Sequence, residues 1–134
     1  MSGGGVLIVA NASNTYARVS FQGGTTVEYN TASVRGGGFY SAGQMNTSDI
    51  RIEHNQANNG AAIYGAFSGT NTYCSVEGGV NSIVGNVTSP TGSGHYSIVD
   101  LTADAPHCFF TGVTASGNSS PRCKSGSATP SCPQ

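Results

Sequence analysis

Short apolar or alternating runs recur along the chain, separated by clusters of glycine and small polar residues. Clear examples lie at residues 5–10, 49–54 and 61–64. Such runs, bounded by turn-forming residues, are typical of short β-strands, in which successive side chains point to opposite faces. No segment combines the 3.6-residue periodicity of a helix with good helix formers. The pattern therefore predicts an all-β protein.

Two short motifs alternate along the chain and make it internally repetitive. The first motif ends in an asparagine and an alanine in its clearest copies, which lie at residues 27–32 and 52–57 with an offset of 25 residues. Weaker copies of it follow at residues 83–86 and 115–118. The second motif is a stretch of small residues, rich in glycine, that ends in two larger residues, and it occurs at residues 3–7, 36–40, 60–64 and 92–96.

The spacing of the motifs distinguishes a repeat from coincidence. The step from the asparagine to the next tyrosine is always 9 or 10 residues, whereas the step back to the next asparagine varies from 15 to 23 residues. Stacked coils behave in this way, because the packed part of each turn keeps its length and insertions enter an exposed loop. We therefore expect a parallel β-solenoid of about four coils, spaced ~4.8 Å apart, over residues 1–118.

The remaining residues, 119–134, lose the repeat and contain three prolines and two cysteines. They are expected to form a C-terminal cap or tail. The chain also starts in the middle of a repeat, and four coils are few for a solenoid. A free end exposes strand edges that favour association. We therefore expect either part of a longer solenoid or a small solenoid that stacks on a partner.

Equivalent positions in the repeats predict two columns of side chains. The recurrent asparagines are expected to form a structural ladder, in which stacked amides bond to one another and to the turn backbone: Asn30, Asn55, Asn86 and Asn118.

The glycine-rich motif predicts a further column of equivalent residues, which we place inside the coil: Val6, Phe39, Ile63 and His95. The next position then points outward and carries tyrosines that could stack on sugar rings, which makes these residues glycan-binding candidates: Tyr40, Tyr64 and Tyr96. The alternative is that these rings only cover the surface.

The repeats at residues 30–40 and 55–64 share the pattern Asn-x-Ala, then two or three variable residues, then small residues that are mostly glycine or alanine, and finally an aromatic residue. This pattern resembles the repeats of polymorphic outer-membrane proteins and of right-handed parallel β-helix proteins of the pectate-lyase-like superfamily. The resemblance covers residues 3–118. It implies a right-handed parallel β-helix in a secreted or surface-displayed protein, either an adhesin or a polysaccharide lyase, hydrolase or epimerase. A fold shared by so many functions does not select among them.

Composition excludes several partners. Only 8% of the residues are charged, against about 25% in typical soluble domains, and the formal net charge is −1. Such a chain lacks the basic surface that nucleic acid or anionic membranes require, and no apolar stretch is long enough to insert into a membrane. No cofactor is expected.

Four cysteines in so small a chain favour an oxidising, extracellular or cell-surface location. Four cysteines allow three pairings, and the sequence alone does not choose among them. Cys74 and Cys108 are separated by about one long coil, so they could bridge adjacent insertion loops. Cys123 and Cys132 would then close the tail.

Two groups of titratable residues are candidates for chemistry. Asp49, Arg51 and Glu53 alternate along one strand, with Glu28 expected beside Glu53. The β-helix lyases that the chain resembles use carboxylates and a basic residue, so this strip is a catalytic candidate. The alternative is a solvated surface in which Arg51 offsets the repulsion between the glutamates.

Candidates for a metal or catalytic site are clustered later in the chain, although their spacing matches no standard zinc signature: His95, Asp100, Asp104 and His107.

The sequence thus favours a non-catalytic extracellular β-helix segment with a structural, adhesive or glycan-binding role. The charged residues are too few to form an acid and base cluster that recurs on one face. The alternative function is a polysaccharide-active enzyme, a lyase or glycoside hydrolase, or part of one. Expected partners are a polysaccharide or surface glycan, other copies of the chain, or further coils of a parent protein.

Overall fold

The computed structural model describes residues 3–9, 17–66, 73–91, 94–101, 108–124 and 132–133. These residues form strands and turns, and they include no helix that is long and apolar enough to cross a membrane. The strands are short, at two to four residues each, as the frequent glycines and small polar residues lead one to expect.

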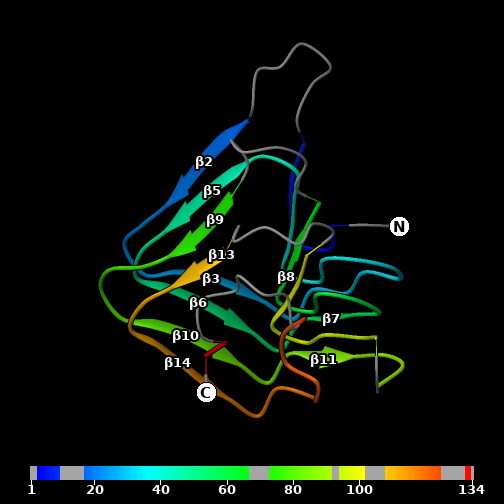
Figure 1. Cartoon of the computed structure of the whole chain (residues 1–134). Helices are drawn as coiled ribbons and strands as arrows, with labels where there is room; N and C mark the ends of the chain where they lie inside the picture. The colour runs from blue at the N-terminus through cyan, green and yellow to red at the C-terminus, as the bar shows by residue number, and fades with distance from the viewer. Residues whose placement is uncertain are drawn as a thin grey trace.

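All strands pair in parallel, within three larger sheets and one small one (Figure 1). The first sheet contains β1 (Val6–Ile8), β4 (Phe39–Ser41), β8 (Ile63–Gly65) and β12 (Val99–Leu101). The second sheet contains β2 (Arg18–Phe21), β5 (Gln44–Thr47), β9 (Tyr73–Val76) and β13 (Cys108–Phe110). The third sheet contains β3 (Thr25–Glu28), β6 (Ile50–Glu53), β10 (Asn81–Val84) and β14 (Val113–Ser116). The small sheet pairs β7 (Gln56–Ala57) with β11 (Val87–Thr88).

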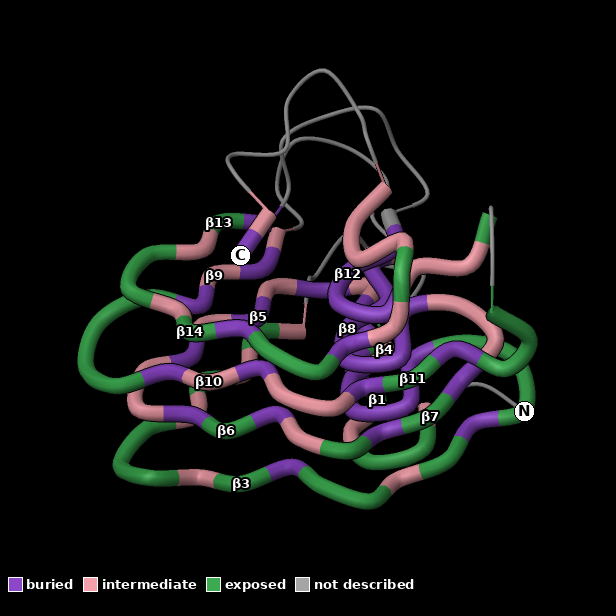
Figure 2. Tube along the Cα trace, turned by 90° about the horizontal axis from the view of Figure 1, so that it is seen from below, coloured by how far each residue is buried: buried purple, intermediate pink, exposed green. Residues whose placement is uncertain are grey.

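The order of the strands shows how the chain is wound. The chain visits the first, second and third sheets in turn and then returns to the first, so that each new strand lies beside its predecessor in the same sheet. Figure 2 shows the successive turns lying one above another. The protein is therefore an all-β stack of parallel strands, consistent with the expected solenoid.

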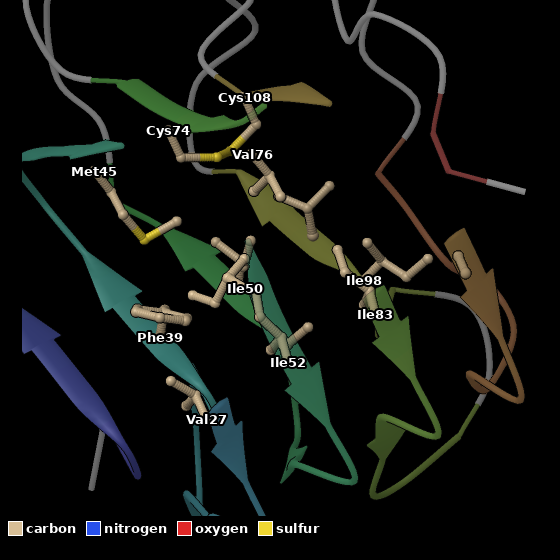
Figure 3. Packing of buried hydrophobic residues seen from close by; sticks show 14 of the residues in the cluster. Val27, Phe39, Met45, Ile50, Ile52, Cys74, Val76, Ile83, Ile98 and Cys108 are labelled. Atoms are coloured by element: carbon tan, nitrogen blue, oxygen red, sulfur yellow. A yellow bond between two sulfur atoms is a disulfide. The ribbon is translucent and has the colours of Figure 1, made fainter. Parts of the chain in front are cut away.

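The core lies inside these turns, where the inward residues of the three larger sheets meet. Along β6 and β10 the burial alternates from residue to residue, as the period of a strand requires. Ile52 of β6 is in register with Val27 of β3 and with Ile83 of β10, and all three side chains are buried (Figure 3). Phe39 adds an edge-to-face contact with Phe21, with ring centroids 5.4 Å apart. The core is thus a set of apolar columns that run along the stack.

Two disulfides link parts of the chain. Cys74 and Cys108 are in register in β9 and β13 with Cα atoms 4.4 Å apart, and both are fully buried in the core. They lie in strands rather than in insertion loops, because the second sheet brings these two positions together. Cys123 pairs with Cys132 and joins the C-terminal segment to itself. Disulfides are typical of oxidising compartments, which agrees with an extracellular location.

The recurrent asparagines form a continuous row of hydrogen bonds at one corner of the stack. Each side-chain amide donates to the Oδ1 of the next asparagine at 3.0 Å, in the order Asn30, Asn55, Asn86 and Asn118. The backbone N–H of each of the first three asparagines donates to the same oxygen at 2.9 to 3.1 Å. Asn55 and Asn86 are fully buried. We call this row the asparagine ladder.

The residue before each ladder asparagine has a positive φ. Tyr29 and His54 have φ angles of 53° and 52°, and Gly85 and Gly117 have angles of 62° and 64°. This left-handed conformation reverses the side-chain alternation at the corner, so that the asparagine turns inward. A Cβ at Gly85 would also come too close to the ring of His54, so that ring would have to move.

The repeat predicts the registers of the first sheet except the last. Phe39 is in register with Val6 and with Ile63, as expected. The prediction for His95 and Tyr96 is wrong, since Val99 pairs with Ile63 and Asp100 pairs with Tyr64. The fully buried pair Ile98 and Val99 fills the core at this level. Burying a large apolar side chain stabilises the fold by about 1.5–3 kcal/mol, whereas burying a histidine costs free energy. The observed register is therefore favoured over the predicted one.

A buried asparagine of the ladder should contribute more to stability than an asparagine on the outer surface. Asn55→Leu removes the oxygen that accepts two hydrogen bonds from Asn30 and the side-chain amide that donates to the Val27 carbonyl and to Oδ1 of Asn86, so we expect a loss of about 1–3 kcal/mol in unfolding free energy. Chemical denaturation measures this change. Asn46→Leu, on the outer surface of β5, is the control and should cost less. Equal effects of the two substitutions would contradict a structural ladder.

Candidate functional site

The outward column of the first sheet holds two of the three predicted tyrosines. Tyr40 and Tyr64 are in register, and their rings stack with centroids 5.4 Å apart and planes at 18°. Leu7 precedes them in this column and Asp100 follows them. Tyr96 lies outside the column because of the register described above. The column is therefore shorter than the expected row of three tyrosines.

Tyr64 is not an open surface for a sugar ring. Only 3% of this residue is exposed, and the guanidinium of Arg35 lies 4.9 Å from its ring centroid. Burial raises the pKa of the Tyr64 hydroxyl. Tyr40 covers one side of the ring, and Asp100 is its register neighbour on the other side. The expectation of an exposed tyrosine ladder is thus wrong at its central residue, because a cation and two neighbours shield that ring.

Asp100 lies within a group of charged side chains at the end of this column. The residue is buried, and burial raises the pKa of its carboxyl group, while the positive charges of Lys124, Arg35 and His95 act to lower it. Cys123 forms a parallel bridge to Val99, which places the following Lys124 beside Asp100. This charge pair can therefore hold the C-terminal segment against the first sheet.

The residues expected near a metal do not form a metal site in the described part of the chain. The ring Nδ1 of His95 lies 2.9 Å from the carbonyl oxygen of Asn58, so this histidine contacts a turn. Asp104 and His107 lie outside the described residues. Among the residues that are described, no group of three His, Cys, Asp or Glu side chains is arranged to hold a metal ion.

The predicted acidic strip lies on the third sheet. Glu28 and Glu53 are in register, as expected, and Arg51 pairs with Thr26 and with Ser82. Glu53 Oε1 accepts a hydrogen bond of 2.9 Å from the Ser82 hydroxyl, on the side away from Glu28. The strip and the tyrosine column therefore occupy different sheets, and the structure does not bring them together in one groove.

Asp49 has a structural contact at the corner before β6. Its φ angle is 52°, and its Oδ1 accepts a 2.7 Å hydrogen bond from the backbone N–H of Val80 in the next turn of the chain. Asp49 and Arg51 also line a shallow hollow of about 390 Å³ together with Val80 and Ser82 and two glycines. The pair could contact a polar ligand there, although Asp49 already accepts one bond from the protein.

The outer face of the second sheet carries a further polar row that the sequence did not reveal. Asn46 of β5 is in register with Ser20 of β2 and with Ser75 of β9. Ser20 is exposed and the other two are half-buried, while the alternate residues of these strands face inward. Phe109 of β13 is in register with Ser75 and is also exposed. We call Ser20, Asn46, Ser75 and Phe109 the outer row.

A second column, beside the outer row, adds an aromatic ring. Tyr73 is in register with Gln44, and its hydroxyl accepts a long hydrogen bond of 3.4 Å from the Arg18 guanidinium. Hydrogen bonds from Arg18 and then from Asn46 lower the pKa of the Tyr73 hydroxyl, although the residue is largely in solvent. The side chain of Asn46 therefore lies near the Tyr73 hydroxyl.

The middle of the outer row borders a small hollow near the corner between the second and third sheets. The hollow measures about 230 Å³, and Asn46 and Ser75 belong both to it and to the outer row. The other lining residues are Phe21, Gln22, Thr47, Ser48 and Glu77. Amide, hydroxyl and carboxylate groups of this kind recognise the hydroxyls of sugars, whereas an apolar ligand would leave them without partners.

The position of this face in the repeat explains why the motifs do not predict it. The strands β2, β5 and β9 lie in the connection of variable length, in which the number of residues between motifs changes from one turn to the next. Their register could not be read from the spacing of the motifs. The alternation of outward polar and inward apolar residues in 18–21 and 44–47 is a signal that could have located the strands, but not aligned them.

Comparison with known proteins identified no related protein. No protein-family model matches the sequence, and the searches of curated proteins and of solved structures gave no match.

The buried carboxyl of Asp100 predicts a particular dependence of stability on pH. Because its pKa is raised above the ordinary value of 3.8, the folded state binds a proton more tightly than the unfolded chain. Its contribution to stability is complete below the unfolded pKa and is lost as the pH rises through the folded pKa. We expect the unfolding free energy of the wild type, relative to Asp100→Asn, to fall over this interval.

Denaturation of the two proteins at several pH values from 3 to 7 measures this difference. His95, Arg35 and Lys124 remain in both proteins, so their own effects largely cancel. A relative stability that rises with pH would show that the surrounding positive charges outweigh burial, and would contradict the raised pKa.

Proposed function

We propose that this chain is a structural and adhesive segment of an extracellular or cell-surface protein, and that it binds glycans without catalysing a reaction. In this proposal the stack is a right-handed parallel β-helix of about four coils, related to the pectate-lyase-like proteins whose repeats it resembles. The parallel sheets and the two disulfides support the architecture and the location.

The observation that carries glycan binding is the outer face of the second sheet. Ser20, Asn46 and Ser75 place one hydrogen-bonding side chain on each successive strand, and Phe109 ends the row with an exposed ring. Sugar sites commonly combine polar groups that contact hydroxyls with rings that contact the apolar face of a sugar. Because these groups stand on a rigid sheet, they lose less conformational freedom when a ligand binds than groups on a flexible loop would.

Three of the described acidic residues support a non-catalytic role. Asp49 accepts a bond from the backbone of Val80, and Glu53 accepts one from Ser82. Asp100 is buried beside Lys124 and is shielded from solvent. Each of these groups has a contact that accounts for its position in the stack.

A polysaccharide-active enzyme is the alternative, and one observation favours it. Glu28 and Glu53 are register neighbours, so their backbones are separated by about 4.8 Å. Retaining glycoside hydrolases hold their two carboxyl groups about 5–5.5 Å apart. In this alternative Glu28 and Glu53 would be the acid and the nucleophile, with Arg51 beside them.

Association with further coils is part of the proposal. β1, β2 and β3 are the terminal strands of their sheets, and in the described part of the chain no strand pairs with their outer edges. Such edges accept hydrogen bonds from another parallel strand. A second copy of the chain or another part of the parent protein would supply that strand.

A glycan-array screen tests the binding function. We expect the folded protein to bind a set of glycans, and Asn46→Ala to weaken that binding by about fivefold, which is the usual effect of one lost hydrogen bond. Ser82→Ala on the third sheet is the control and should bind as the wild type does. Absence of binding to all glycans, or an equal loss for both variants, would contradict the proposal.

An assay for new reducing ends and for unsaturated products distinguishes the enzyme from the binding protein. We expect no product from any glycan that binds. Product formation that Glu53→Gln abolishes, while Asp49→Asn preserves it, would instead establish the hydrolase alternative.

A further inference from the structure

The outer row has the spacing of a polymer site rather than that of a single-sugar site. Successive strands of a sheet lie about 4.8 Å apart, and the row contributes one side chain from each of β2, β5, β9 and β13. This rise is close to the length of one hexose in an extended, equatorially linked chain. A polysaccharide that crosses the strands would therefore meet an equivalent contact at each sugar.

The chemistry of the outer row is uncharged. Its members are two hydroxyls, one amide and one phenyl ring, in Ser20, Asn46, Ser75 and Phe109. The nearest positive charge, Arg18, is in contact with the Tyr73 hydroxyl, and Glu77 places a negative charge in the adjoining hollow. An anionic chain would be repelled by Glu77, and its charged groups would find no ion pair along the row.

The order of side chains along the row also gives the site two different ends. Asn46 and Ser75 lie at the small hollow, where amide and hydroxyl groups can bond to sugar hydroxyls. Phe109 lies beyond Ser75 at the edge strand, where its exposed ring can stack on the face of a terminal sugar. Hydrogen bonds therefore act along the row, and ring stacking acts at its end.

We infer that the outer row binds an uncharged, extended polysaccharide, equatorially linked, which lies across the strands with one sugar on each strand. This inference rests on the proposed glycan-binding function and specifies its ligand. A chain with axial linkages curls, so it would leave the flat sheet after one or two sugars.

Calorimetric titration with β-1,4-linked glucose oligomers of two to six units tests the inference. We expect the affinity to rise by about fivefold for each added sugar up to four units, because each sugar adds about one hydrogen bond or ring contact, and then to remain constant. An α-1,4-linked glucose hexamer and a galacturonate hexamer should bind at least tenfold more weakly. The affinity for the β-linked hexamer should be unchanged between low and physiological salt.

Two matched pairs of variants locate the site. Phe109→Leu should weaken binding of the four-unit oligomer by several-fold through the loss of ring stacking, while Phe109→Tyr should retain it. With the two-unit oligomer, which can avoid the terminal strand, Phe109→Leu should have a smaller effect. Ser75→Ala should weaken binding and Ser82→Ala should not.

The outcomes separate this inference from the proposed function. Tight, salt-dependent binding of the galacturonate hexamer, or equal affinity for the α- and β-linked hexamers, would overturn the inference and leave glycan binding intact. Affinity that does not depend on oligomer length would also overturn it, because a single-sugar site would then suffice. If no glycan on the array binds, the proposed function itself fails.

Discussion

The asparagine ladder is the constraint on which the rest of the structure depends. The amides of Asn55 and Asn86 are fully buried, and a buried amide without partners costs about 1–3 kcal/mol. Their hydrogen bonds are satisfied only when one asparagine lies directly beneath the next, together with backbone carbonyls of the preceding turn. A slip of one residue would break these bonds and would turn Ile52 and Ile83 out of the core. The ladder thus fixes the register of the third sheet, whose strands lead directly into it.

A fixed register determines what the outside of the molecule presents. Because parallel strands repeat in register, each outward position becomes a column that runs along the stack. In the first sheet such a column becomes a shielded group of Tyr40, Tyr64 and Asp100. In the second sheet it becomes the polar row that contains Asn46. The same geometry that stabilises the core therefore also spaces the groups available to a ligand.

The sequence predicted the parts of the fold that recur without insertions. The step between the two motifs is nearly constant, so equivalent residues of successive turns could be aligned. In this way Asn30 was matched with Asn55, and Phe39 with Ile63. The error at His95 arose because a glycine-rich stretch looks like the motif, whereas Val99, the residue that pairs with Ile63 and enters the core, comes four residues later. Motif similarity was outweighed there by burial. The outer row could not be predicted, because its register depends on stacking that the variable connection hides.

Hydrogen exchange of the side-chain amides of asparagine, followed by NMR, tests the central claim most directly. If the ladder fixes the stack, the amide protons of Asn55 and Asn86 exchange only when the protein unfolds, so their exchange is slow and follows the global stability. The amide of Asn46, on the outer face of the second sheet, then exchanges rapidly. Rapid exchange at all three asparagines would contradict the account.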